Sequence, residues 1–171
     1  MTTPEFVIEL RRSIGHAPLW LSGITAYVRD GEGRVLLGRR ADTGLWALVY
    51  GIIEPGEQPA DTVVREVREE TGVDVKVETL VAVSSSPRLV TYPNGDQARY
   101  LNLSFLCRPA AGGNDRPSVS DDESLEVGWF RRDALPSPLT ESTVDRMREV
   151  EEWLERSAGP GRDRAASFQV G

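Results

Sequence analysis

The feature that most constrains this chain is a run of carboxylates between residues 51 and 73, GIIEPGEQPADTVVREVREETGV. Glu66, Glu69 and Glu70 fall within five consecutive positions, and Glu57 precedes them. Like charges at helical spacing repel by roughly 0.2–0.5 kcal/mol for each exposed i,i+4 pair. Only two arginines lie close enough in the sequence to offset this repulsion. The run therefore indicates that the folded protein binds a cation that the sequence itself does not supply.

The same run predicts a helix that begins near Pro59 and ends before Gly72. Proline suits the first turn of a helix, and glycine suits the position just past its end. At about 100° per residue, one apolar stripe is formed by Ala60, Val63, Val64 and Val67. Glu66 and Glu70 stack four positions apart beside this stripe, with Glu69 next to them. We therefore expect the glutamates to line a cleft between core and solvent.

The chemistry of these side chains narrows the choice of cation. Ligand sets made only of oxygen suit hard cations, and Mg²⁺ takes one or two carboxylates while it bridges to substrate phosphates. Mn²⁺ prefers the same ligands. Glu57 could join the cluster through the turn at Pro55-Gly56, and Arg65 could hold a glutamate rotamer with its planar fork. The alternative interpretation, for the hexapeptide REVREE alone, is a solvated helix face.

Charge and composition exclude several classes of function. The net charge of −7 argues against binding a nucleic acid polymer, which needs a basic surface. Cys107 is the only cysteine, so an intrachain disulfide is excluded, and His16 is the only histidine, which excludes a histidine-rich zinc site. No apolar run approaches the ~20 residues that span a bilayer, and the N-terminus lacks a signal-peptide pattern. We therefore expect a cytoplasmic protein without a membrane partner.

The rest of the chain alternates strand and helix patterns. Helices are expected over 4–14, with Phe6, Val7, Leu10 and Ile14 on one side, and over 141–156, with Val144, Met147, Val150 and Leu154 on one side. Strands are expected over 20–30, 34–40, 45–53, 75–86, 98–108 and 125–131. Asp30-Gly31 and Asn94-Gly95 predict hairpin turns. Hairpins require antiparallel pairs, so the pattern favours an α+β or α/β/α sandwich with a mixed central sheet.

One domain accounts for this pattern, since 171 residues suit a single core. We expect that domain over 1–156, with an N-terminal helical extension over 1–19 and the core over 20–156. Residues 157–171 have little to bury and are expected to form a flexible tail. Two alternatives stay open for the N-terminal helix and Trp20. They could cover the domain's own sheet, or they could pack on a second subunit in a homodimer.

Taken as a whole, residues 51–73 resemble the Nudix box, G-x5-E-x7-R-E-U-x-E-E-x-G-U, where U is a bulky aliphatic residue. Every specified position is matched, by Gly51, Glu57, Arg65, Glu66, Val67, Glu69, Glu70, Gly72 and Val73. Arg39-Arg40, the segment 44–46 and the segment 127–130 also look like MutT-like members, so the resemblance covers roughly residues 20–156. The pattern Gly15-His16-Ala17-Pro18-Leu19 and the later TYPNGD, residues 91–96, resemble a bacterial subgroup of unassigned substrate. The Nudix resemblance implies an α/β/α sandwich with the box helix in a strand-loop-helix-loop motif.

The resemblance implies roles for individual residues. It places metal ligands at Glu66, Glu70, Glu57 and the backbone carbonyl of Tyr50. It implies three catalytic roles. Glu69 would be a further metal ligand, directly or through water, and Arg65 would orient the glutamates. The third role belongs to a carboxylate from a distal loop. That loop offers Asp121, Asp122, Glu123 and Glu126. The spacing to Trp129 makes Glu123 resemble the distal glutamate of MutT-type enzymes, and the alternative is a solvated acidic loop. The entry Val49-Tyr50-Gly51 departs from the common Pro-Gly-Gly, which leaves the turn geometry open.

Four residues outside the box are candidate substrate contacts, namely Arg39, Arg40, Trp46 and Tyr92. The arginines could bind phosphates, although on an alternating strand only one of them can face the cleft. Trp46 could stack on a base, but a large aromatic side chain is more often part of a core. Tyr92 lies on a predicted hairpin loop, where it could contact substrate.

The function that the resemblance implies is hydrolysis of the pyrophosphate linkage in a nucleoside diphosphate derivative, with Mg²⁺ or Mn²⁺ as cofactor. The small-molecule substrate stays open between a nucleotide sugar such as ADP-ribose, a dinucleotide and a nucleoside triphosphate. The alternative is a catalytically inactive nucleotide-binding sensor on the same fold, which the full set of glutamates disfavours. An isomerase of allylic diphosphates is disfavoured because neither Cys107 nor His16 lies near the box.

Overall fold

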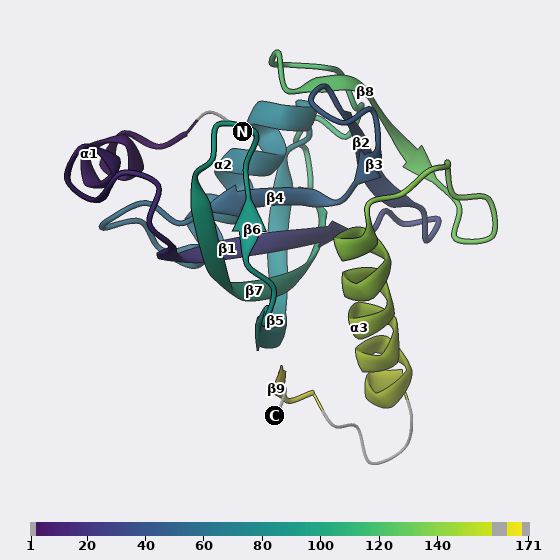
Figure 1. The fold of residues 1–171 in the computed structure, drawn as a ribbon. Coiled ribbons are helices and arrows are strands. Elements are labelled where there is room, and N and C mark those ends of the chain that lie inside the picture. Colours follow the sequence, from purple (N-terminus) through teal and green to yellow (C-terminus); the bar gives the residue numbers. More distant parts are fainter. Residues whose placement is uncertain (1–2, 159–163, 169–171) are drawn as a thin grey trace.

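The computed structural model describes residues 3–158 and 164–168, and its ribbon is layered, with helices on both sides of a sheet (Figure 1). The helices within these ranges are α1 (Glu5–Ile14), α2 (Pro59–Thr71) and α3 (Glu141–Ala158). The strands are β1 (Leu19–Val28), β2 (Val35–Arg40), β3 (Trp46–Ala47), β4 (Val49–Ile52), β5 (Val75–Ser85), β6 (Val90–Thr91), β7 (Gln97–Pro109), β8 (Ser124–Phe130) and β9 (Ser167–Phe168).

A mixed sheet forms the centre of the molecule. Its strand order is β4-β1-β7-β5-β9, with β6 also paired to β7. β1 runs parallel to β7, whereas β4 and β5 are antiparallel to their neighbours β1 and β7. Alternate residues of β1 enter different cores, because Ile24 shares a cluster with Val63 of α2 and Tyr27 shares one with Met147 of α3. The predicted sandwich with a mixed central sheet is confirmed.

A smaller sheet, of order β3-β2-β8, corrects one predicted strand pairing and one predicted strand. The turn after β1 exists, with the Asp30 N–H donating to Arg34 O, but beyond the Arg29–Val35 bridge β1 and β2 enter different sheets. The single strand predicted over 45–53 is wrong. The chain changes sheet at Leu48, whose N–H donates to the Thr143 side chain of α3, so that β3 and β4 are separate strands.

Several local predictions are confirmed. Helix α2 begins at Pro59, and Gly72 follows its last residue with a φ of 69°, a conformation that glycine adopts without strain. The Asn94-Gly95 turn joins β6 to β7, where the Tyr92 N–H donates to Asp96 O. The strand predicted over 125–131 is β8.

The buried face of α2 differs from the predicted stripe. Val63 and Val67 are fully buried, but Ala60 and Val64 are exposed. Glu66 takes their place on the buried face, with 8% of its surface exposed. The reason is that α2 packs against three strands, β1, β4 and β5. The face of the helix that these strands cover is centred nearer to Val67 and Glu66 than the predicted apolar stripe was. Glu66, which was predicted beside the apolar stripe at the edge of the core, is thus part of the buried face itself.

The two other helices are also only partly as predicted. Met147 and Val150 of α3 are buried, but Val144 is exposed and Trp153 is buried instead. In α1, Val7 packs in a small cluster with Leu21 and Ile52, which covers the domain's own sheet. Leu10 and Ile14, which were predicted on the same side of the helix as Val7, are exposed over 42% and 40% of their surfaces.

The C-terminal segment is described only in part. Residues 159–163 and 169–171, which belong to the expected flexible tail, lie outside the described residues. Within that tail, Ser167 pairs in parallel with Ala82 of β5, and Trp153 donates its indole N–H to Ala165 O at 2.9 Å. Across the described part of the chain, every helix is too short or too polar to cross a lipid bilayer.

Candidate active site

Arg65 joins three acidic side chains on α2 and on the loop before it. Its Nε and one terminal nitrogen donate to the two carboxylate oxygens of Glu57, at 2.9 and 3.1 Å. The other terminal nitrogen donates to Glu66 at 2.9 Å and to Glu69 at 3.2 Å. Because a guanidinium presents its donors in a rigid planar fork, these bonds fix the positions of all three carboxylates. This is the arrangement that an orienting role for Arg65 requires.

A short turn returns Glu57 to the helix. The Glu57 N–H donates to Glu54 O at 3.0 Å, and Gly56 within the turn has a φ of 89°, which favours glycine. The Glu57 carboxylate also accepts the Glu54 N–H at 3.3 Å. The predicted turn at Pro55-Gly56 therefore brings Glu57 back to Arg65, as joining the cluster requires.

Gly51 is the residue that lets Glu66 lie close to the sheet. A Cβ atom built on Gly51 would stand 2.3 Å from Cγ and 2.6 Å from Oε1 of Glu66, distances at which one of the two must move. The Glu66 side chain therefore crosses the backbone of β4 immediately after Tyr50. The glycine that opens the motif is required by this close approach, and not by its own φ.

Burial and charge shift the pKa values of these carboxyl groups in opposite directions. Hydrogen bonds from Arg65 lower the pKa of Glu57 to about 2. Burial raises the pKa of Glu66 to about 7, although Arg65 opposes that shift. Burial, with repulsion from Glu66, raises the pKa of the half-buried Glu70 to about 8. Glu66 and Glu70 are thus two neighbouring carboxyl groups whose ionised forms need a compensating cation.

These residues fit a hard divalent cation by their chemistry. They offer carboxylate oxygens and one backbone carbonyl, which is the set that Mg²⁺ and Mn²⁺ prefer. Among the residues that the structure describes, no three acidic side chains already converge on a point as metal ligands. Arg65 instead bridges Glu57, Glu66 and Glu69. The oxygen atoms that a metal would need are therefore present. We expect the carboxylate oxygens to converge on the metal when it binds.

Of the two candidate arginines, Arg40 lies on the side of the glutamates. Arg40 donates to both carboxylate oxygens of Asp42, at 2.9 and 2.6 Å, and its charge slightly opposes the rise that burial causes in the pKa of Glu70. Arg39 is exposed and donates to Gly44 O at 3.1 Å. The pairing of β2 with β8 shifts register between Arg39 and Arg40.

The side chains of the three predicted aromatic residues, Trp46, Tyr50 and Tyr92, are each engaged with other parts of the fold. Trp46 is a core residue with 7% of its surface exposed, and its ring meets Phe130 edge to face at 4.9 Å between centroids. It therefore offers little surface on which a base could stack. The Tyr50 hydroxyl bonds to Thr143 of α3 at 2.8 Å, which leaves its backbone beside Glu66. The Tyr92 hydroxyl bonds to the Tyr100 hydroxyl at 2.5 Å.

Two acids of the distal loop, Asp121 and Glu123, are linked to each other in the structure. The charge of Asp121 contributes to the raised pKa of Glu70, so Asp121 lies on the side of the glutamate cluster. One Asp121 oxygen accepts the Glu123 N–H at 3.0 Å, and the Glu123 carbonyl accepts the Ala41 N–H at 2.8 Å. Sequence spacing favoured Glu123, and the only signal for Asp121 was its place among four neighbouring acids.

Comparison with known proteins gives a consistent result. Residues 20–154 match the NUDIX domain family model. A MutT-like protein of Streptomyces ambofaciens is 36% identical over 124 residues, which is 72% of each chain. The 8-oxo-dGDP phosphatase NUDT18 of Mus musculus is 31% identical over 139 residues, 80% of this chain. That alignment spans only 38% of the mouse protein.

The fold is shared with solved structures. The crystal structure of an ADP-ribose pyrophosphatase from Streptococcus suis is 25% identical and superimposes with a TM-score of 0.64. The match covers 87% of this chain and 98% of that one. The layered arrangement described above is therefore the arrangement of that structure as well.

The raised pKa of Glu70 predicts a stability difference in metal-free buffer. Between pH 4.5 and 8 the carboxyl group is ionised in the unfolded chain but protonated in the folded one, so the free energy of unfolding falls as pH rises through this window. Glu70→Gln removes that loss. At pH 8 with EDTA we expect Glu70→Gln to be more stable than wild type by on the order of 2 kcal/mol. Urea denaturation at pH 4 and at pH 8 measures the difference.

The matched control is Glu9→Gln, which removes an exposed carboxylate from α1. It should change stability by less than about 0.5 kcal/mol at both pH values. Equal stability of Glu70→Gln and wild type at pH 8 would contradict the burial of this carboxyl group.

Proposed function

We propose a function on the premise that this chain belongs to the Nudix family. It hydrolyses the pyrophosphate linkage of a nucleoside diphosphate derivative, with Mg²⁺ or Mn²⁺ as cofactor. The observation that carries this proposal is the cluster in which Arg65 contacts Glu57, Glu66 and Glu69 and in which Glu70 lies beside Glu66. The catalytic core is residues 20–156, and residues 1–19 are a helical extension of it.

Glu66 and Glu70, with support from Glu57 and the Tyr50 carbonyl, would hold the metal. When bound, a divalent cation supplies positive charge to phosphate oxygens and makes water more acidic. Arg65 limits the freedom of the glutamates, so that less reorganisation is needed when the substrate arrives. Glu69, which is exposed and reaches Arg65, lies at the solvent edge of the cluster, where it could act directly or through water.

Two chain residues act on the substrate and the attacking water. Arg40 lies near Glu70 and would bind a phosphate oxygen in place of one of its bonds to Asp42. A carboxylate from the distal loop takes the proton from water as general base. Asp121, which influences Glu70, is favoured for this step over Glu123. Trp46 has no part in it, because it belongs to the core.

The substrate class is supported by what the relatives share. The mouse relative is named for the dephosphorylation of a nucleoside diphosphate and the Streptococcus structure for the cleavage of ADP-ribose. Both substrates contain a nucleoside attached to a diphosphate. We therefore propose that this chain takes a nucleotide sugar, a dinucleotide or a nucleoside phosphate, and that a diphosphate is the part that all of its substrates share.

The test is release of phosphate or of a nucleotide product from a panel containing ADP-ribose, NAD, a dinucleoside polyphosphate, 8-oxo-dGDP and the nucleoside triphosphates. Each is incubated with Mg²⁺, Mn²⁺ or EDTA. We expect turnover of at least one compound with metal and none with EDTA. Glu70→Gln should lower kcat by about 100-fold or more, because it removes a ligand of the ion on which the chemistry depends. Glu9→Gln should match wild type.

Absence of turnover throughout the panel, together with tight binding of one nucleotide, would contradict the hydrolase. That result would instead establish the nucleotide-binding sensor that the sequence left as the alternative. The urea denaturation of Glu70→Gln in EDTA described above would show independently that a loss of activity is not a loss of fold.

The choice of base has its own test. Asp121→Asn should lower kcat with the stronger effect, about 100-fold, and should flatten the acidic limb of the pH–kcat profile. Glu123→Gln should leave that limb in place. The opposite order of effects would return the role to Glu123.

A further inference from the structure

A layer of polar side chains lies between the central sheet and α3. Thr25 of β1 and Asn102 and Ser104 of β7 are buried in it. Thr25 donates to the Asn102 side-chain oxygen at 2.9 Å. Asn102 donates to Ser104 at 3.0 Å, and Ser104 donates to Glu149 of α3 at 3.1 Å. These buried groups therefore bond to one another and, through Glu149, to the helix.

Arg146 lies on the face of α3 that meets this layer. Ser142 accepts a hydrogen bond from Tyr50 of β4. Two turns later, Glu149 accepts one from Ser104 of β7. Ser142, Arg146 and Glu149 follow one another at spacings that place side chains on one face of a helix. Arg146 is therefore held between two points at which α3 is bonded to the sheet.

The guanidinium of Arg146 has no partner of its own in the part of the chain that the structure describes. The side chain is half-buried, yet it makes no hydrogen bond there and has no carboxylate oxygen within 4.0 Å. The adjacent Asp145 pairs with Arg148 at 3.6 Å. Burial lowers the pKa of Arg146, so its surroundings disfavour the charge. A partly desolvated guanidinium with unused donors suits an anion that has several oxygens.

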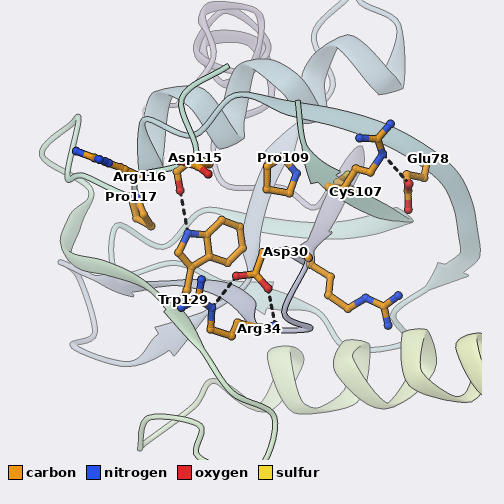
Figure 2. A pocket seen from close by; sticks show the side chains of 12 residues that line it. Asp30, Arg34, Glu78, Cys107, Pro109, Asp115, Arg116, Pro117 and Trp129 are labelled. Atoms are coloured by element: carbon orange, nitrogen blue, oxygen red, sulfur yellow. Dashed lines mark hydrogen bonds and ion pairs between the residues drawn. The ribbon is translucent and has the colours of Figure 1, made fainter. Parts of the chain in front are cut away.

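The arginines in the pocket of Figure 2 differ from Arg146 in this respect. The pocket has a volume of about 590 Å³ and is lined by the turn after β1, the end of β7 and β8. Its Arg34 is paired with Asp30 at 2.6 Å. Its Arg108 is paired with Glu78 at 2.9 Å. Carboxylates of the fold itself thus balance these two charges, whereas the charge of Arg146 is left for a ligand.

The Tyr50 hydroxyl offers a second donor, and buried groups fix its orientation. Thr143 is fully buried, and its hydroxyl oxygen accepts from the Leu48 N–H at 3.1 Å and from the Thr140 hydroxyl at 2.8 Å. A hydroxyl has two acceptor positions and one proton, so Thr143 donates that proton to Tyr50, at 2.8 Å. The Tyr50 proton is then directed to the exposed Ser142, at 3.3 Å. A ligand oxygen can replace this long bond at the surface.

The Tyr50 hydroxyl and Arg146 are neighbours. The two residues that bond to the hydroxyl, Thr143 and Ser142, precede Arg146 by three and four positions. Side chains at these spacings are about 5–6 Å apart at their Cβ atoms. Burial lowers the pKa of Arg146, and Tyr50 is the largest influence that opposes this shift. The oxygens of one phosphate point in different directions, so a single phosphate can accept from both donors.

Tyr50 also connects these donors to the glutamate cluster. It lies on β4, the outermost strand in the order β4-β1-β7-β5-β9. The next residue, Gly51, is the point at which the Glu66 side chain crosses that strand. Successive side chains of a strand point to opposite faces of its sheet. A substrate whose diphosphate is bound at the glutamates can therefore extend around the edge of β4 to the Tyr50 hydroxyl.

We propose that the Tyr50 hydroxyl and Arg146 form a subsite for a phosphate group of the substrate that lies outside the linkage that is cleaved. When the substrate binds, the Tyr50 proton turns from Ser142 to a phosphate oxygen, and Arg146 gains the anion that the fold does not supply. The inference rests on the proposed function and narrows it to substrates with at least three phosphates. The third phosphate is in line with the cleaved linkage or attached to a ribose, and in both places it presents the same oxygens.

Isothermal titration calorimetry of the full chain in Mg²⁺ tests the subsite without turnover. The first pair of ligands is α,β-methylene-ATP and α,β-methylene-ADP, in which carbon replaces the bridging oxygen and which differ by one in-line phosphate. The second pair is AMP with and without a further phosphate on its ribose. The test variants are Arg146→Gln and Tyr50→Phe, which keeps the backbone carbonyl. The matched control is Arg148→Gln, an exposed arginine of the same helix.

We expect wild type to bind the ligand with the additional phosphate at least about tenfold more tightly in one of the two pairs, since two donors reach that phosphate. That pair identifies where the phosphate is attached. Arg146→Gln should weaken binding of this ligand about tenfold and Tyr50→Phe about threefold. Binding of the ligand without the additional phosphate should change by less than about twofold, which also verifies that the variants are folded. Arg148→Gln should match wild type.

Equal binding of both ligands in each pair would overturn the inference and leave the proposed function intact. The same holds if Arg146→Gln weakens both ligands of a pair equally, since that result would indicate a general effect of charge. If none of the ligands binds, the inference fails together with the nucleotide substrate of the proposed function.

Discussion

The ion pairs of Arg65 are the interaction on which the arrangement of the candidate site depends. They connect the loop before α2 to two turns of the helix, through Glu57, Glu66 and Glu69. Exposed ion pairs contribute little, but the Glu57 and Glu66 side chains are only 18% and 10% exposed, so their bonds are less screened by solvent. This network can form only because Gly51 has no side chain where Glu66 crosses β4.

The same site contains a conflict between folding and function. Glu66 and Glu70 are buried enough for their pKa values to rise to about 7 and about 8, so their ionised forms destabilise the folded chain at neutral pH. Apolar side chains at these positions would fold more readily. Strongly perturbed carboxyl groups gathered at the edge of a core are typical of functional sites, where the cost is offset by the ligand that binds there. The proposed divalent cation is such a ligand.

Local features of the sequence predicted the helix, its ends and the identity of the clustered glutamates. Pro59 and Gly72 act through their own backbone preferences, and residue spacing alone decides that Glu66 and Glu70 share a face. The buried face of α2 could not be predicted in this way, because it depends on which strands pack against the helix. For that reason Val64 is exposed and Glu66 is buried.

Long-range contacts explain the other differences. Residues 45–53 form two strands and not one because of the hydrogen bond between Leu48 and Thr143, which are 95 positions apart. The relation between Asp121 and Glu70 depends on how the loop before β8 returns to α2, and four adjacent acids give the sequence no means to choose among them.

Binding of a divalent cation by the glutamates around Arg65 can be measured without a substrate. Electron paramagnetic resonance reports free Mn²⁺ while wild type or Glu66→Gln is titrated at pH 8. We expect wild type to remove Mn²⁺ from solution and Glu66→Gln to bind it at least about tenfold more weakly. Equal binding by the two proteins, or no binding by wild type, would contradict a metal site at these glutamates.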